Sequence, residues 1–143
     1  MLKDKIALVT GGSRGIGSSI CKELAKAGAT VLINYANSKD SALKVLEEIV
    51  QGNGKGEVVE FDVSDYSIVE EKIKYLIEKY EKIDILVNNA GITRDSLFMR
   101  MKESQWDEVF ETNTKGVFNC TKNVVRVMLR NQYGKIINIS SVV

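Results

Sequence analysis

The sequence predicts an α/β fold in which a parallel sheet is connected by crossover helices. Five short apolar runs rich in β-branched residues alternate with longer segments of helical period. Turn residues separate the segments: Gly28 closes the first helical segment, residues 52–54 precede the third apolar run, and Gly134 precedes the fifth. No linker, repeat or low-complexity stretch divides the chain. Residues 1–143 are therefore expected to belong to one domain.

The expected strands lie at residues 5–10, 30–35, 56–61, 82–89 and 134–140. Among the helical segments, Tyr66 to Tyr80 is the clearest, because its apolar residues recur every three or four positions and Lys and Glu occupy the other face. Ser64 or Asp65 can cap its first turn. Ser104 followed by Asp107 forms a weaker capping pattern for the next helix.

The charge balance excludes a general electrostatic attraction to nucleic acid or membranes. The 143 residues carry 20 basic and 19 acidic side chains, for a net charge of +1. No stretch approaches the roughly 18 apolar residues of a membrane span, and the N-terminus does not resemble a signal peptide. We therefore expect a cytoplasmic protein that binds neither nucleic acid nor membrane.

The absence of histidine limits the chemistry of the chain. It excludes Ser-His and Cys-His nucleophile pairs and His-ligated zinc, and no metal site is expected. Cys21 and Cys120 each lie among apolar residues of a helical segment, which favours buried free thiols over a disulfide. Catalysis would have to use Ser, Tyr, Lys, Asn or a cofactor.

A glycine-rich segment, TGGSRGIG at residues 10–17, joins the first strand to the first helix. Gly11, Gly15 and Gly17 follow the spacing T-G-x-x-x-G-x-G. Glycines at such a turn let the backbone approach a pyrophosphate, and the helix N-terminus presents free N–H groups. Tight packing can also require glycine without any ligand, and the motif alone leaves both interpretations open.

Polar segments follow three further strands. Asp62-Val63 ends the third strand, residues 88–91 (NNAG) end the fourth, and residues 138–141 (NISS) end the fifth. In a parallel sheet these ends meet at the carboxyl edge, beside the glycine-rich segment, where ligands bind. Asp62 could instead cap a helix, and the asparagines could satisfy loop backbone. Their joint placement favours a binding site.

Taken together, TGGSRGIG, Asp62-Val63, NNAG, Asn113 within ETNTKGVF, and IINISS resemble the short-chain dehydrogenase/reductase family over the whole chain. The longer segments GITRDSLFMRMKESQWDEV, KGVFNCTK and GKIINISSVV resemble its 3-oxoacyl-[acyl-carrier-protein] reductase branch. The resemblance implies a doubly wound, Rossmann-like parallel sheet and NADPH-dependent reduction of 3-oxoacyl-[acyl-carrier-protein] in fatty acid biosynthesis. It also implies a homotetramer and an acyl carrier protein as partner.

The same resemblance implies roles for individual residues. Ser141 would hold the substrate carbonyl, and Asn113 would support a water relay. Ser140 is the less favoured serine, because side chains alternate along a strand. The implied cofactor-binding residues are Gly11, Gly12, Ser13, Arg14, Gly15, Ile16, Gly17, Asp62, Val63, Asn89, Ala90 and Gly91.

The end of the second strand favours NADP(H) over NAD. An acid there would bind the ribose hydroxyls of NAD and repel a 2'-phosphate, but no acid occurs between Ile33 and Asp40. Arg14 and Lys39 can supply cations for that phosphate. A cation is unfavourable at the positive end of a helix dipole, so the position of Arg14 favours a ligand over a merely exposed side chain.

The catalytic tyrosine and lysine of the family, spaced Y-x-x-x-K, are expected beyond Val143. Two such pairs occur within the chain. Tyr75–Lys79 lies near the end of its helix, toward the amino edge of the sheet, and Tyr35–Lys39 lies beside the adenosine half of the cofactor. Tyr133 precedes the fifth strand and also belongs to the amino edge. We therefore expect residues 1–143 to be the N-terminal portion of one NADP-binding domain, with its sheet cut after the fifth strand and that edge uncovered.

Alternatives to this function remain open. The chain could belong to another short-chain ketone or alcohol oxidoreductase, since fold and cofactor do not specify the substrate. It could also be a non-catalytic nucleotide-binding module if it ends naturally at residue 143. Arg126 and Arg130, four residues apart on one helix face, could meet an acidic carrier protein, or could be solvated or support subunit contacts.

Overall fold

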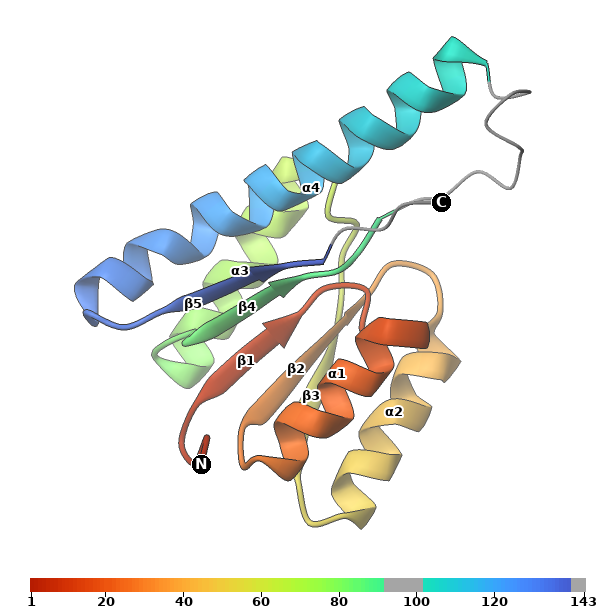
Figure 1. The fold of residues 1–143 in the computed structure, drawn as a ribbon. Helices are drawn as coiled ribbons and strands as arrows, with labels where there is room; N and C mark the ends of the chain where they lie inside the picture. The colour runs from red at the N-terminus through yellow and green to blue at the C-terminus, as the bar shows by residue number, and fades with distance from the viewer. Residues whose placement is uncertain (92–101, 140–143) are drawn as a thin grey trace.

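The structure, a computed structural model, describes residues 1–91 and 102–139. These residues form a parallel sheet in the order β3-β2-β1-β4-β5, with helices on both faces (Figure 1). The elements along the chain are β1 (Ile6–Val9), α1 (Gly15–Lys26), β2 (Thr30–Tyr35), α2 (Lys39–Gln51), β3 (Lys55–Glu60), α3 (Tyr66–Tyr80), β4 (Ile85–Asn88), α4 (Glu103–Arg130) and β5 (Lys135–Asn138). All five expected strands are therefore present, and the doubly wound α/β fold is confirmed.

The sheet separates two hydrophobic cores because successive side chains of a strand point to opposite faces. Leu8, Leu32 and Leu86 belong to the core under α3 and α4. Val9 and Ile33, one residue further along their strands, belong to the core under α1 and α2. Strands β1 and β4 are buried along their whole length. Their sequences are therefore continuous apolar runs and do not alternate between apolar and polar residues.

The helix starts differ in part from the sequence prediction. Asp65, and not Ser64, caps α3 by accepting a hydrogen bond from the N–H of Ile68 at 3.3 Å. The predicted Ser104 cap is wrong, because Ser104 already lies inside α4. Lys102 precedes that helix, and its N–H donates to the side chain of Gln105 at 3.0 Å.

Both cysteines are buried free thiols, as the sequence predicted. Cys21 packs in the core under α1 and α2, and Cys120 packs in the core under α3 and α4. Burial raises the pKa of each thiol to about 12. Neither cysteine is therefore a nucleophile at neutral pH.

Helix α4 and strand β5 carry apolar surface that the described residues leave exposed. The 28 residues of α4 span about 42 Å at 1.5 Å per residue, and its first half runs past the end of the sheet (Figure 1). Trp106, Phe110 and Phe118 are each more than half exposed. On β5, Ile136 and Ile137 are exposed at the edge of the described sheet. No described helix is both long enough and apolar enough to cross a membrane.

Candidate functional site

The order of the strands creates a switch point between β1 and β4. From β1 the chain moves through β2 to β3 on one side, and then returns to β4 on the other side. The segments that follow β1 and β4 therefore diverge at the carboxyl edge, which is where open α/β sheets bind ligands. These segments are residues 10–17, called here the glycine loop, and residues 88–91, called here the NNAG turn.

Thr10 ties the glycine loop to the NNAG turn. Its hydroxyl oxygen accepts hydrogen bonds from the N–H groups of Asn89 and Ala90, both at 3.0 Å, and Thr10 is only 1% exposed. In return, the side-chain amide of Asn89 donates to the carbonyl of Gly11 at 3.0 Å. These bonds satisfy buried polar groups on both sides and hold the two segments in one arrangement.

Two different physical constraints explain why the loop contains glycines. A Cβ at Gly11 would lie 2.8 Å from Cα of Ala90, and a Cβ at Gly17 would collide with the carbonyl oxygen of Gly11. Close packing within the protein therefore accounts for these two residues, as one sequence interpretation allowed. Gly11 and Gly15 also have positive φ angles, of +62° and +54°, which suit glycine. Gly15 differs from the other two because no atom lies within 4 Å of the position of a Cβ.

The start of α1 is open to a ligand. Arg14 is its N-cap residue and makes no side-chain capping bond, and the first turn contains no acidic residue. Arg14, Gly15 and Ile16 are exposed at the crest of the loop, whereas Ser13 is half-buried and Gly12 is buried. The first N–H groups of a helix attract anions, so the residues present fit a bound phosphate group.

Arg14 also reaches the end of β2. Its guanidinium donates to the hydroxyl of Ser38 at 2.6 Å, and Lys39 begins α2 at the same corner. No acidic residue occurs between Tyr35 and Asp40. The guanidinium of Arg14 and the hydroxyl of Ser38 are therefore placed where they could bind an anionic group, and the binding role of Lys39 stays a prediction.

The Asp62–Val63 segment follows β3 and is held from two sides. The carboxylate of Asp62 accepts bonds from the N–H and the hydroxyl of Ser64, at 2.9 and 2.7 Å. Asp62 therefore does not cap α3, which was one interpretation of the sequence. From α4, the side-chain amide of Asn119 donates to the carbonyl of Val63 at 2.8 Å.

Asn113 of α4 approaches the NNAG turn. A Cβ at Gly91 would lie 2.8 Å from the side-chain oxygen of Asn113, so the two residues approach closely. Ser140 and Ser141 lie outside the described residues. The backbone leading to them runs beside the NNAG turn, because Ile139 N–H donates to the carbonyl of Asn88 at 3.0 Å.

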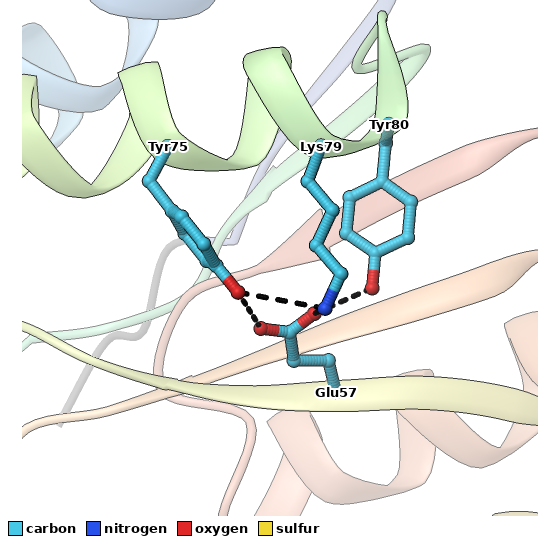
Figure 2. A network of polar contacts seen from close by, with 4 residues as sticks. All are labelled: Glu57, Tyr75, Lys79 and Tyr80. Carbon is cyan, nitrogen blue, oxygen red and sulfur yellow. Dashed lines mark hydrogen bonds and ion pairs between the residues drawn. The ribbon is translucent and has the colours of Figure 1, made fainter.

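Two of the tyrosines considered in the sequence analysis, Tyr75 and Tyr133, lie away from this site. Tyr75 and Lys79 of α3 both bind the carboxylate of Glu57 on β3, each at 2.8 Å, and Tyr80 binds it too (Figure 2). Tyr133 packs under Lys5, whose Nζ lies 3.7 Å from the ring centroid, just before β1 at the amino edge.

Tyr35, from the other Y-x-x-x-K match, is buried in β2, so its hydroxyl group has little access to a substrate.

Arg126 and Arg130 line a groove between α3 and α4. The groove is mixed in charge, because α3 contributes Glu70, Glu71 and Glu78 to its other wall. Among the residues that the structure describes, neither arginine forms an ion pair within 4 Å. Their charges are therefore available at the surface.

Four buried polar residues of this region were not among the predicted site residues: Thr10, Asn34, Asn88 and Asn119. The sequence gives one indication of Asn34 and Asn119. Asn34 is a polar residue inside an apolar run, and Asn119 is a polar residue on a buried helix face. That signal marks burial, but it does not reveal which backbone groups the side chain satisfies.

Comparison with known proteins shows the family and agrees with the fold. Residues 5–143 match the family described as short chain dehydrogenase, and the chain belongs to that family. In the crystal structure of a metagenomic short-chain oxidoreductase in complex with NADP, 31% identical, the fold is the same with a TM-score of 0.89 over 99% of this chain and 64% of that one.

The curated relatives are more specific. The 3-oxoacyl-[acyl-carrier-protein] reductase FabG of Staphylococcus epidermidis is 50% identical over 98% of this chain, and that of Staphylococcus aureus is 50% identical over all of it. The 3-oxoacyl-[acyl-carrier-protein] reductase of Synechocystis is 46% identical over 99% of the chain. The chain spans 57 to 58% of the length of these relatives.

The Glu57 cluster of Figure 2 yields a pH-dependent prediction about stability. Burial acts to raise the pKa of Glu57, but hydrogen bonds from Lys79, Tyr80 and Tyr75 outweigh it, and the pKa is lowered. The carboxylate therefore stabilises the fold above its unfolded pKa, and this contribution is lost as the pH falls through the lowered folded value. Glu57→Gln should reduce the free energy of unfolding by about 1 kcal/mol at neutral pH, with a smaller difference below about pH 4.

Urea denaturation at neutral and acidic pH measures this difference. Glu60→Gln is the matched control, because Glu60 lies on the same strand and is exposed. A loss of stability that is equal at both pH values would contradict the electrostatic role of Glu57.

Proposed function

We propose that the full protein reduces 3-oxoacyl thioesters on acyl carrier protein to 3-hydroxyacyl thioesters, with NADPH as the reductant. The observation that carries the proposal is the 46 to 50% identity, over nearly the whole chain, to relatives named for this reaction. Residues 1–143 would form the N-terminal portion of a single NADP-binding domain. The cytoplasmic location expected from the sequence stays a prediction.

The proposed cofactor site extends along the carboxyl edge of the sheet. The glycine loop and the start of α1 would hold the phosphates, the Asp62–Val63 segment would hold the adenine, and residues 89–91 would hold the ribose beside the nicotinamide. The open space at Gly15 and the exposed Arg14 support this arrangement. When bound, the nicotinamide supplies the hydride for carbonyl reduction.

The residues of this chain would orient the reacting groups. The hydroxyl of Ser141 would donate a hydrogen bond to the substrate carbonyl oxygen, which gains negative charge as the carbonyl is reduced. Asn113, beside Gly91, would hold water that leads protons toward the site. The proton itself would come from the tyrosine of the family's Y-x-x-x-K pair, proposed to follow residue 143, because Tyr75 and Tyr133 lie away from the candidate site and Tyr35 is buried.

Two other functions fit the same fold. An oxidoreductase for another ketone or alcohol would share the cofactor site and differ only in the substrate pocket. A non-catalytic nucleotide-binding module would lack the tyrosine and lysine. Reading the continuation of the coding sequence for Y-x-x-x-K separates an enzyme from the binding module, and activity on a carrier-linked 3-oxoacyl thioester separates the two enzymes.

The cofactor preference can be tested at Arg14. Because Arg14 and Lys39 supply positive charge at the end of β2, the full-length protein should bind NADPH about 1 to 3 kcal/mol more tightly than NADH. Arg14→Ala should narrow this preference, mainly by weakening NADPH binding. Fluorescence titration with both cofactors measures the two affinities.

Arg126→Ala serves as the control for Arg14, because it removes the same kind of side chain from α4. Equal or tighter binding of NADH by the unaltered protein would rule out the NADPH preference.

The catalytic serine gives a second test. Ser141→Ala in the full-length enzyme should lower the rate of carbonyl reduction by roughly 10² to 10³, as expected when one oriented donor is removed. NADPH binding should change little, because Ser141 is proposed to contact the substrate. Ser140→Ala is the matched control, and a larger loss for that variant would assign the role to Ser140 instead.

A homotetramer is proposed from the family and from the exposed surface of α4. Trp106 and Phe110 stack edge to face with their ring centroids 5.4 Å apart, and both remain more than half exposed. Exposed aromatic side chains of this kind are enriched at subunit interfaces. Light scattering of the full-length protein measures the mass of the assembly. A mass equal to that of one monomer would contradict the proposal.

Docking of the carrier protein is proposed at the end of α4. Arg126 and Arg130 are free of ion pairs among the described residues, so they can meet an acidic helix. Arg130→Glu should reduce the rate on a carrier-linked substrate more than on a small soluble thioester. The difference should grow at low ionic strength, because salt screens exposed charges over about 8 to 10 Å.

Comparison of the two substrates separates docking from structure for Arg130. Equal losses on both would indicate a structural or assembly role, and no loss on either would remove Arg130 from the function.

A further inference from the structure

Asn34 is a buried polar residue within an otherwise apolar strand. It lies next to the end of β2 and is 1% exposed. Strand β2 runs between β1 and β3, so Asn34 stands between the glycine loop that follows β1 and the Asp62–Val63 segment that follows β3.

The side-chain amide of Asn34 binds both neighbours at once. Its oxygen accepts the N–H of Gly11 at 3.1 Å. Its nitrogen donates to the carbonyl of Phe61 at 2.9 Å and to that of Val59 at 3.3 Å. The backbone carbonyl of Asn34 also accepts the N–H of Gly12 at 2.9 Å. One residue thus fixes the first turn of the glycine loop and the chain just before Asp62.

Few side chains can replace this amide. The side chain at this buried position must present a hydrogen-bond acceptor toward β1 and a donor toward β3, and it must have the length of asparagine to reach both. A leucine would leave the N–H of Gly11 and the carbonyl of Phe61 without the partner that the amide supplies, which is costly in a buried region. An ionised aspartate would keep the acceptor and lose the donor.

We infer that Asn34 is a positioning residue that holds the glycine loop and the Asp62–Val63 segment at the spacing a dinucleotide requires. The inference rests on the proposed function, because these two segments are the proposed binding sites for the phosphates and the adenine. Asn34 itself is too buried to touch a cofactor. It acts through Gly11 on one side and through Phe61 on the other.

Replacement of Asn34 by aspartate tests the bond to Gly11 and the bond to Phe61 separately. In Asn34→Asp the buried carboxyl has a raised pKa, because burial disfavours its charged form. When ionised, it accepts from Gly11 but repels the carbonyl of Phe61. When protonated, it can donate to that carbonyl and restore the natural pattern. The hydrogen-bond partners of the Asn34 amide are all backbone groups, of Gly11, Tyr35, Val59 and Phe61. The neighbouring titratable side chains along β2 and the chain of β3 are those of Tyr35, Glu60 and Asp62.

The experiment measures NADPH affinity of the full-length protein by fluorescence titration across pH. At about pH 8, Asn34→Asp should bind NADPH about tenfold more weakly than the unaltered protein, the effect of one lost hydrogen bond to a charged or buried partner. Toward about pH 5.5 the difference should shrink to less than about threefold, because the carboxyl becomes protonated. Asn34→Leu should lose affinity equally at both pH values.

Asn53→Asp is the matched control, because Asn53 is exposed in the turn before β3 at the opposite edge of the sheet. It makes the same chemical change and should alter affinity at neither pH. If Asn34→Leu does not fold, Asn34→Ser takes its place, since the smaller side chain leaves room for a bridging water. Unchanged affinity of Asn34→Asp at both pH values, or a loss without recovery at low pH, would overturn the inference.

Hydrogen exchange without cofactor distinguishes failure of this inference from failure of the proposed function. In Asn34→Asp at about pH 8, after correction for the intrinsic rate, the amides of residues 10–17 and 59–63 should exchange faster than in the unaltered protein, with recovery at low pH. If these changes occur and no variant binds NADPH, the proposed function fails but the coupling by Asn34 stands. If NADPH binds and exchange is unchanged, the coupling is wrong.

Discussion

The contact between the glycine loop and the NNAG turn is the constraint on which the rest of the site depends. A parallel sheet that reverses its strand order leaves two chain segments diverging at its carboxyl edge, and their backbone groups need partners. The hydroxyl of Thr10 supplies two of these partners, and Asn89 supplies another. Side chains are absent at Gly11 and Gly17 because the two segments touch there. The surface that remains open begins beyond this contact, at Gly15.

The fold could be predicted from the sequence because its signals are local or periodic. Continuous apolar runs indicated strands covered on both faces, and turn residues marked the ends of the helices. The errors lie at helix starts. The Ser104 pattern met the residue preference for a cap, but α4 already begins at Glu103. Capping depends on where the preceding chain enters the helix, which residue types alone do not specify.

The candidate site could be predicted only in part, for a different physical reason. Sequence order and the geometry of a parallel sheet were enough to bring Gly11, Asp62 and the NNAG turn to one edge. They could not separate glycines required by packing from those that leave space for a ligand, because that depends on neighbours distant in sequence. They also missed Asn34 and Asn119, whose partners are backbone groups on other elements. Such bonds leave no pattern along the chain.

The burial of the two thiols has a practical consequence for chemical labelling. Cys21 and Cys120 are inaccessible, and pKa values of about 12 leave almost no thiolate at neutral pH. A thiolate must attack the maleimide double bond for labelling to occur, so both native cysteines in this part of the chain are unreactive toward maleimide reagents. A cysteine introduced at the exposed Ile16 would be the reactive one. A fluorophore attached there would report directly on occupancy of the loop crest, without removal of either native cysteine from the packed cores.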